Sequence, residues 1–148
     1  MIAVIQRVSR ASVKIDGSIK GSIENGLLIL LGVKDGDTSR DAELLADKIA
    51  KLRIFSDENG KMNLSCVDVC GSVLVISNFT LLANYKKGNR PDYMNGAKPV
   101  VANELYEYFC RRIGGYLPTE KGEFGADMKV ELLNDGPVTI VMDSEILK

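Results

Sequence analysis

The sequence contains no histidine, and this absence excludes more chemistry than any other feature of its composition. Neither a serine–histidine–aspartate triad nor a cysteine–histidine pair can form within the chain. A histidine-ligated metal site is excluded as well, and so is imidazole as a general base near neutral pH. We therefore expect no metal and no cofactor. An enzyme of this sequence must use carboxylates, hydroxyls, thiols, backbone groups or its own substrate.

Cysteine and long apolar runs are also scarce. The three cysteines, Cys66, Cys70 and Cys110, are an odd number without the spacing of a disulfide framework. Two thiols without histidine are a poor zinc site, so we interpret Cys66 and Cys70 as small buried residues. The longest apolar run, Leu27 to Leu31, is far too short to cross a bilayer, and no signal peptide is recognisable. These features predict a reduced, cytoplasmic protein without a membrane partner.

The charges nearly cancel, because 19 lysines and arginines face 20 acidic residues and leave a formal net charge of -1. This balance excludes general attraction to a polyanion as the main binding force. The chain has 148 residues, of which 45% are hydrophobic, so it can bury a core without disulfides or metals. No repeat or linker interrupts it, and we predict a single domain over residues 1–148.

Patterns of apolar residues predict short strands and two helices. Strands are expected at 2–9, 13–15, 26–33 and 72–76, with Asp16-Gly17 as a hairpin turn and 26–33 buried on both sides. The segments 128–132 and 138–142 are read as two further strands joined by a turn at 134–137. Together they suggest about six to eight strands arranged in hairpins. This predicts an α+β fold with mostly antiparallel sheets or an open β-barrel and two packed helices.

Each predicted helix has a start signal and an apolar stripe. The first begins at Thr38 or Ser39, and the second begins at Pro99 and ends at Gly114-Gly115. Residues at helical spacing are expected to face the core. They are Ala42, Leu45, Ile49 and Leu52 in the first helix, and Val101, Leu105, Tyr108 and Phe109 in the second.

Three polar segments are candidates for chemistry. Residues 77–81, Ser-Asn-Phe-Thr-Leu, follow a purely apolar strand and either cap its solvated end or present hydroxyls and N–H groups to a ligand. Residues 134–139 contain Gly136-Pro137, where proline removes a donor just as a strand resumes. The third segment is a polar loop that either is simply solvated or contacts phosphate through Lys86, Lys87 and Arg90.

Taken together, these segments resemble the D-aminoacyl-tRNA deacylases of the bacterial and eukaryotic type. The likeness covers nearly the whole chain, and several long motifs occur in the right order. They are MIAVIQRV at 1–8, RIFSD at 53–57, GKMNL at 60–64, GSVLVISNFTL at 71–81, GNRP at 88–91 and NDGPVT at 134–139.

The resemblance implies a homodimer that hydrolyses the ester between a D-amino acid and tRNA, with active sites at the subunit interface. It implies that Gly136 and Pro137 form a cis peptide that enters the partner's site as a chiral filter, oriented by Arg7. Ser77, Asn78, Phe79 and Thr80 would line the pocket around the ester and the terminal adenosine. The family usually has glutamine where this chain has Asn78, which puts any role of that side chain in doubt.

The residues favour a mechanism of backbone stabilisation. N–H groups around Phe79 and Thr80 would bind the developing oxyanion while water attacks, and the resemblance implies help from the 2′-OH of the terminal ribose. Thr80 is a poor nucleophile without a base, and Asp135 or Asp143 could serve only if the fold brings them close. A main-chain filter that excludes L side chains has nothing to exclude in glycine, so glycyl-tRNA is an expected second substrate.

Two other functions stay open at this point. One is a non-catalytic RNA-binding or assembly module, which the lack of an obvious base favours. The other is a different ester or amide hydrolase with Thr80 or a cysteine as nucleophile. For the deacylase, the low net charge predicts local contact with the acceptor end of tRNA through Lys86, Lys87 and Arg90, and no DNA partner.

Overall fold

The computed structural model describes all residues from 1 to 148. Its strands are β1 (Ile2–Ile15), β2 (Ser18–Ile23), β3 (Gly26–Gly32), β4 (Phe55–Ser56), β5 (Met62–Leu64), β6 (Ser72–Ser77), β7 (Thr119–Lys121) and β8 (Lys129–Asp143). The α-helices are α1 (Ser39–Ala50) and α2 (Pro99–Gly114), and two short 3-10 helices are η1 (Phe79–Leu82) and η2 (Ser144–Leu147).

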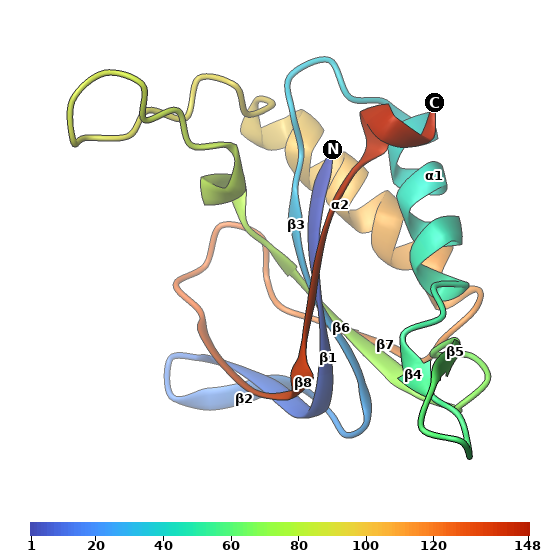
Figure 1. Cartoon of the computed structure of the whole chain (residues 1–148). Coiled ribbons are helices and arrows are strands. Elements are labelled where there is room, and N and C mark those ends of the chain that lie inside the picture. The colour runs from blue at the N-terminus through green and yellow to red at the C-terminus, as the bar shows by residue number, and fades with distance from the viewer.

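Six strands form one mixed sheet in the order β2-β1-β3-β6-β7, with β8 on the other edge of β1. The long strand β1 pairs with β3 through its first half and with β2 through its second half, while β8 follows it along almost its whole length. Figure 1 shows β1 and β8 crossing the molecule together. The pairings among β1, β2, β3 and β8 are antiparallel, as the hairpin pattern predicts, but β3–β6 and β6–β7 are parallel.

The sheet has two apolar faces, each with its own core. Both helices lie on one side of it (Figure 1), and alternate β3 residues, including Leu27 and Ile29, pack towards them. Leu28 instead joins Val8, Val13 and other buried residues on the opposite face, where the curled sheet closes on itself like an open barrel. The predicted burial of β3 on both sides is therefore confirmed. No helix of the chain is both long enough and apolar enough to span a membrane.

The C-terminal hairpin predicted around residues 134–137 is wrong. Residues 129–143 form the single strand β8, and both halves pair with the same neighbour, since Val130 lies opposite Val13 and Ile140 opposite Ile5. The register shifts between these halves, which identifies the Asn-Asp-Gly-Pro segment as a bulge within a strand. Turn residues favour a bulge as readily as a hairpin, so the local pattern did not distinguish them.

Both helices begin where predicted and α2 also ends where predicted, but α1 ends at Ala50, before the predicted stripe residue Leu52. Thr38 precedes α1, and its N–H donates to the Asp41 carboxylate at 2.9 Å. In α2 the buried face comprises Tyr106, Phe109, Cys110 and Ile113. Val101, predicted to face the core, is 43% exposed. Phe109 is fully buried, and Leu105 and Tyr108 pack partly buried against the same core, so Val101 alone departs from the predicted stripe of α2.

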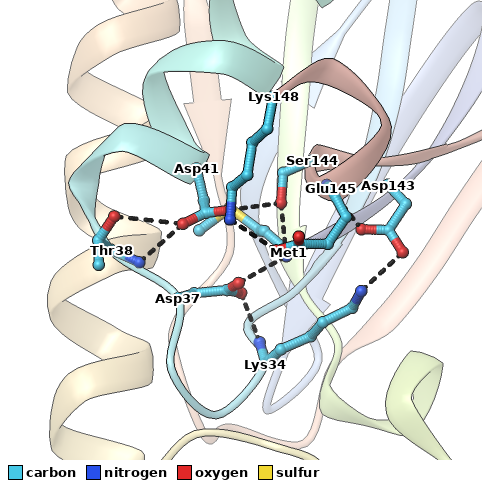
Figure 2. Close-up of polar contacts among 9 residues, drawn as sticks. All are labelled: Met1, Lys34, Asp37, Thr38, Asp41, Asp143, Ser144, Glu145 and Lys148. Atoms are coloured by element: carbon cyan, nitrogen blue, oxygen red, sulfur yellow. Dashed lines mark hydrogen bonds and ion pairs between the residues drawn. The ribbon is translucent and has the colours of Figure 1, made fainter.

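The two ends of the chain meet in a buried polar cluster (Figure 2). The amino group of Met1 donates to Asp37 Oδ1 and to Ser144 Oγ, both at 2.8 Å. The Ser144 hydroxyl in turn donates to Asp41 Oδ1 at 2.7 Å, and the Lys148 ammonium lies 2.9 Å from the same carboxylate. Because Asp41 and Ser144 are almost completely buried, this cluster fixes α1 against the end of β8.

Candidate functional site

The first candidate motif lies where β6 leaves the sheet. Ser77 is the last residue of the strand, opposite Leu31 of β3. The N–H of Asn78 still donates to the Leu31 carbonyl at 2.8 Å, after which the chain turns into η1. The change from apolar to polar sequence thus coincides with the end of sheet pairing.

Backbone donors are available at this turn. Phe79 and Thr80 are the first two residues of η1, where N–H groups have no partner within the helix. Neither N–H donates to any acceptor within the chain, and both residues are exposed. Two neighbouring free N–H groups are the arrangement that stabilises an oxyanion.

The side chains of the motif interact with each other. The Thr80 hydroxyl donates to Asn78 Oδ1 at 2.5 Å. The Asn78 side chain is therefore engaged within its own turn. Because the Thr80 proton is directed at an amide and no base contacts this hydroxyl, the geometry does not activate Thr80 as a nucleophile.

A cavity of about 720 Å³ opens beside this motif. Its lining includes Ser77, Asn78 and Phe79, and most of the remaining lining residues are apolar. Thr80 is not part of the lining. The other walls come from the ends of β3 and β6, the segment leading into α2, and residues 124–130 before and within β8. Such a largely apolar hollow with a few polar groups at one side is typical of a small-ligand site.

The second candidate motif is the bulge of β8. Arg7 Nε donates to the Asp135 carbonyl at 2.9 Å, and its Nη1 donates to the Ile54 carbonyl at 2.8 Å. The Asn134 amide donates to the carbonyls of Arg7 and Val138, at 2.9 and 3.0 Å. The Gly136-Pro137 peptide bond is cis, and both residues are exposed. The structure thus presents an outward-facing Gly-Pro turn held by two side chains.

The resemblance implied Arg7 but not Asn134 as a support for this turn. The available signal was its position directly before Asp-Gly, since asparagine commonly bonds to nearby backbone groups in turns. The cavity wall at residues 124–130 was also missed, because its position depends on how β8 begins and not on any local motif.

The two motifs do not meet within one chain. The Gly-Pro turn lies beside Arg7, whose partner in β3 is Leu27, whereas Ser77 pairs with Leu31. Four residues of strand span about 13 Å, and the three strand spacings from β8 to β6 add about 14 Å across the sheet. No residue of the turn lines the cavity. A site that contains both motifs therefore needs a second chain.

Neither candidate base reaches the cavity. Asp143 lies at the end of β8 and pairs with Lys34 at 2.6 Å. Burial raises its pKa, but the hydrogen bond and charge of Lys34 outweigh this and leave the pKa lowered. Asp135 lies in the Gly-Pro bulge beside Arg7. Neither carboxylate lines the cavity, so neither can act there from the same chain.

The cysteines do not form a reactive site. All three are free, and none lines the cavity. Cys66 is buried as predicted, but the predicted burial of Cys70 is wrong, since this residue lies exposed in the turn before β6. Burial raises the pKa of Cys66 and of Cys110 to about 12, which keeps both as unreactive thiols at neutral pH. These positions weaken the alternative of a cysteine hydrolase.

One cluster of carboxylates has the spacing of a metal site. Ligand atoms of Asp37, Asp41 and Glu145 lie within 4.8 Å of one another. The Met1 amino group is 2.8 Å from Asp37, and the Lys148 ammonium contacts Asp41 and Glu145 at 2.9 and 2.6 Å. Ammonium groups already balance these charges, and the cluster lies at the chain ends, outside the cavity.

The basic segment forms an exposed loop on the molecule. An isolated bridge between Asn84 and Asp92 closes its base. Lys86, Lys87 and Arg90 lie between them, and all three are exposed. The loop follows η1 directly and projects from the body at the upper left of Figure 1, on the side where the cavity motif leaves the sheet.

Solved structures share this architecture. A c-Myc DNA Unwinding Element Binding Protein matches with a TM-score of 0.91 and 39% identity, over 97% of this chain and 98% of that one. A structure described as "Structural Analysis of a probable eukaryotic D-amino acid tRNA deacylase" matches with a TM-score of 0.80, over 96% of this chain and 98% of that one. At 15% identity, this second likeness concerns the fold alone.

The chain belongs to the D-Tyr-tRNA(Tyr) deacylase family, whose model matches residues 4–143. A D-aminoacyl-tRNA deacylase of Parabacteroides distasonis is 54% identical over 98% of both chains. One of Anaeromyxobacter dehalogenans is 56% identical over 99% of both chains. The resemblance predicted from the motifs is confirmed, and so is the α+β fold with two helices packed on a nearly closed sheet.

Proposed function

We propose that this chain hydrolyses the ester bond of D-aminoacyl-tRNA and releases the free D-amino acid and tRNA. The main support is the full-length identity above 50% with proteins named D-aminoacyl-tRNA deacylase. The cavity supports it independently, since Phe79, whose N–H is free, lines a hollow large enough for an aminoacyl ester, and the free N–H of Thr80 follows it directly in the chain. The protein would act in the cytoplasm, where charged tRNA is made and used.

The chemistry would rest on the main chain. The ester carbonyl oxygen would face the N–H groups of Phe79 and Thr80, which stabilise the negative charge of the tetrahedral intermediate. Water would add to the carbonyl carbon, assisted by the neighbouring 2′-OH as the family resemblance implies. The bond from that carbon to the ribose oxygen then breaks, and the ribose oxygen takes up a proton. Ser77 and Asn78 would form the polar side of the pocket.

The active unit would be a homodimer. A single chain keeps the Gly136-Pro137 turn away from the cavity, so the turn can act as a filter only in a partner's site. The outer edge of β8 is free, because this strand pairs only with β1. Exposed apolar side chains along β8, Leu133 and Val141, add a surface that a partner could cover.

A deacylation assay tests the proposal directly. The protein is mixed with tRNA that carries labelled D-tyrosine, and release of the free amino acid is followed beside L-tyrosyl-tRNA. Rapid release from the D ester alone is expected. Binding of the charged tRNA without release would instead support the non-catalytic module.

DNA binding is a second candidate, favoured by the printed name of one structural relative. The net charge of -1 argues against it, because affinity for duplex DNA comes chiefly from neutralised phosphates. Micromolar or tighter binding to duplex DNA at 0.15 M salt, together with no deacylation, would favour this candidate over the enzyme.

Thr80→Ala should retain most of the activity. The Thr80 hydroxyl bonds to Asn78 and has no base, so its loss should lower kcat for D-tyrosyl-tRNA by less than about tenfold. Single-turnover deacylation measures this. Thr119→Ala is the control, because its hydroxyl donates to the Leu117 carbonyl and lies outside the cavity lining. A loss of 10⁴-fold or more in Thr80→Ala alone, with substrate binding intact, would identify Thr80 as the nucleophile.

Glycyl-tRNA should also be a substrate. A main-chain filter rejects an L side chain by occupying its space, and glycine has no side chain to reject. We expect glycyl-tRNA to be hydrolysed at least about 100-fold faster than L-alanyl-tRNA, equivalent to about 2.7 kcal/mol. The three esters of glycine, L-alanine and D-alanine are compared under single-turnover conditions. Cleavage of the D ester together with complete resistance of glycyl-tRNA contradicts exclusion as the basis of selectivity.

A further inference from the structure

The basic loop is attached to the cavity through a firm base. Asn84 N–H donates to the Asp92 carbonyl at 2.8 Å, and Asp92 N–H donates to the Asn84 carbonyl at 2.9 Å. These paired bonds fix the two ends of the loop against each other, as in a short hairpin. Tyr93 directly follows this hydrogen-bonded base.

Tyr93 makes a specific contact with the catalytic motif. Its ring meets the ring of Phe79 edge to face, with centroids 5.0 Å apart and planes at 77°. Both residues line the cavity. The Phe79 side chain is 62% exposed, and the Tyr93 ring is the aromatic side chain that packs against it.

We propose that Tyr93 is a positioning residue that couples the basic loop to the oxyanion-binding backbone. The inference rests on the function proposed above. The acceptor end of tRNA binds the loop tip through Lys86, Lys87 and Arg90, and the loop base holds Tyr93 against Phe79. The ring contact then fixes the start of η1, so the Phe79 and Thr80 N–H groups point at the ester. The same loop thus contacts the nucleic acid at its tip and positions the oxyanion donors at its base.

The expected size of the effect follows from the type of contact. Edge-to-face aromatic pairs contribute modestly beyond simple burial. Losing this pair should lower kcat about threefold to tenfold. The KM for tRNA should stay nearly constant, because the basic side chains that contact phosphate are unchanged.

Four variants and two substrates test the coupling. The substrates are D-tyrosyl-tRNA and 3′-O-(D-tyrosyl)adenosine, which lacks the phosphates. Tyr93→Ala should lower kcat on both, and Tyr93→Phe, which keeps the ring, should restore it. A combined Lys86→Ala, Lys87→Ala and Arg90→Ala variant should raise KM for tRNA at least fivefold and leave the adenosine ester unaffected. Tyr85→Ala is the matched control, since this ring is 78% exposed in the same loop and packs on no aromatic side chain.

Amide dynamics provide a readout that does not depend on turnover. The ¹⁵N order parameters of Phe79 and Thr80 should fall in Tyr93→Ala and remain at wild-type values in Tyr93→Phe and Tyr85→Ala. Unchanged kcat and order parameters in Tyr93→Ala, beside an active wild type, overturn the coupling alone. An equal fall of kcat in Tyr85→Ala overturns it too, since the effect would then belong to the loop in general. If the wild type releases no amino acid from either substrate, the proposed function itself fails.

Discussion

Gly136→Ala should lower kcat/KM for D-aminoacyl-tRNA by at least about 100-fold while the protein stays folded. A β-carbon on Gly136 would lie 2.4 Å from the Val138 nitrogen and 2.7 Å from its Cγ2, and the residue has φ +151°. The turn must therefore shift its backbone, and it loses the position that Arg7 and Asn134 impose. Misplacing a positioning element by about 1 Å typically costs about 100-fold in rate.

Selectivity should fall together with rate. If the turn is the filter, L-tyrosyl-tRNA should be rejected less strongly by Gly136→Ala than by the wild type, so the ratio of D to L hydrolysis should decrease. Parallel single-turnover assays with both esters measure this ratio, and circular dichroism verifies the fold. Wild-type rates and selectivity in Gly136→Ala would remove the turn from the mechanism.

Gly60→Ala is the matched control for this experiment. Gly60 also has a positive φ, +75°, but a β-carbon there would meet nothing within 4 Å. It lies in the turn before β5, which contributes no residue to the cavity lining. Its substitution should cost about 1 kcal/mol of stability through backbone strain and leave deacylation unchanged. The comparison separates the strain of a positive φ from displacement of the turn.

Asp41→Asn should be among the most destabilising conservative changes in the chain, at about 2–3 kcal/mol at pH 7. Asp41 is 1% exposed and accepts hydrogen bonds from the Ser144 hydroxyl and the Thr38 N–H, beside the Lys148 ammonium (Figure 2). Asparagine removes the charge and leaves Lys148 without its buried partner. The expected fall in Tm is roughly 4–12 °C, measured by thermal denaturation at fixed protein concentration.

The pH dependence gives this prediction a second test. Burial raises the pKa of Asp41, but the bonds from Ser144, Thr38 and Lys148 together leave it well below its usual range. A carboxylate with a depressed pKa stabilises the fold above its unfolded pKa of about 3.9, and this stability is lost as the pH falls through the folded pKa. The wild type should therefore lose more stability below about pH 4 than Asp41→Asn does.

Asp127→Asn is the control for the charge change. The Asp127 side chain is 85% exposed and pairs with Lys129, which is also exposed. Exposed pairs of this kind contribute about 0–1 kcal/mol, so the variant should melt close to the wild type. If Asp41→Asn were as stable as Asp127→Asn at pH 7, the buried cluster would contribute little to folding.

Local signals in the sequence located most elements of the fold. The Asp16-Gly17 turn is a tight hairpin with both residues at positive φ, as the dipeptide predicts. Pro99 starts α2, and the apolar run from Gly26 forms a strand buried on both faces. In each case the residues that determine the turn, helix start or strand lie within that element or next to it. They act through turn chemistry, capping or a run of apolar side chains.

The pairings that decide the site are not local. The residues of the two halves of β8 predict a hairpin, because nothing in them reveals that β1 is long enough to pair with both. Arg7 reaches the Ile54 carbonyl, 47 residues away, and Asp41 contacts Ser144, 103 residues away. Such contacts depend on register between distant segments. The motifs could therefore be recognised from the sequence, but not their mutual distance.

That distance has a consequence for how this protein would behave genetically. In the proposed dimer, each subunit supplies the reacting groups of its own active site. Its Gly136-Pro137 turn serves as the gatekeeper of the other subunit's active site. A copy damaged only in the gatekeeper and a copy damaged only in the chemistry would then complement each other, since a mixed pair contains one fully intact centre. Two differently defective alleles could in this way jointly protect a cell that neither protects alone.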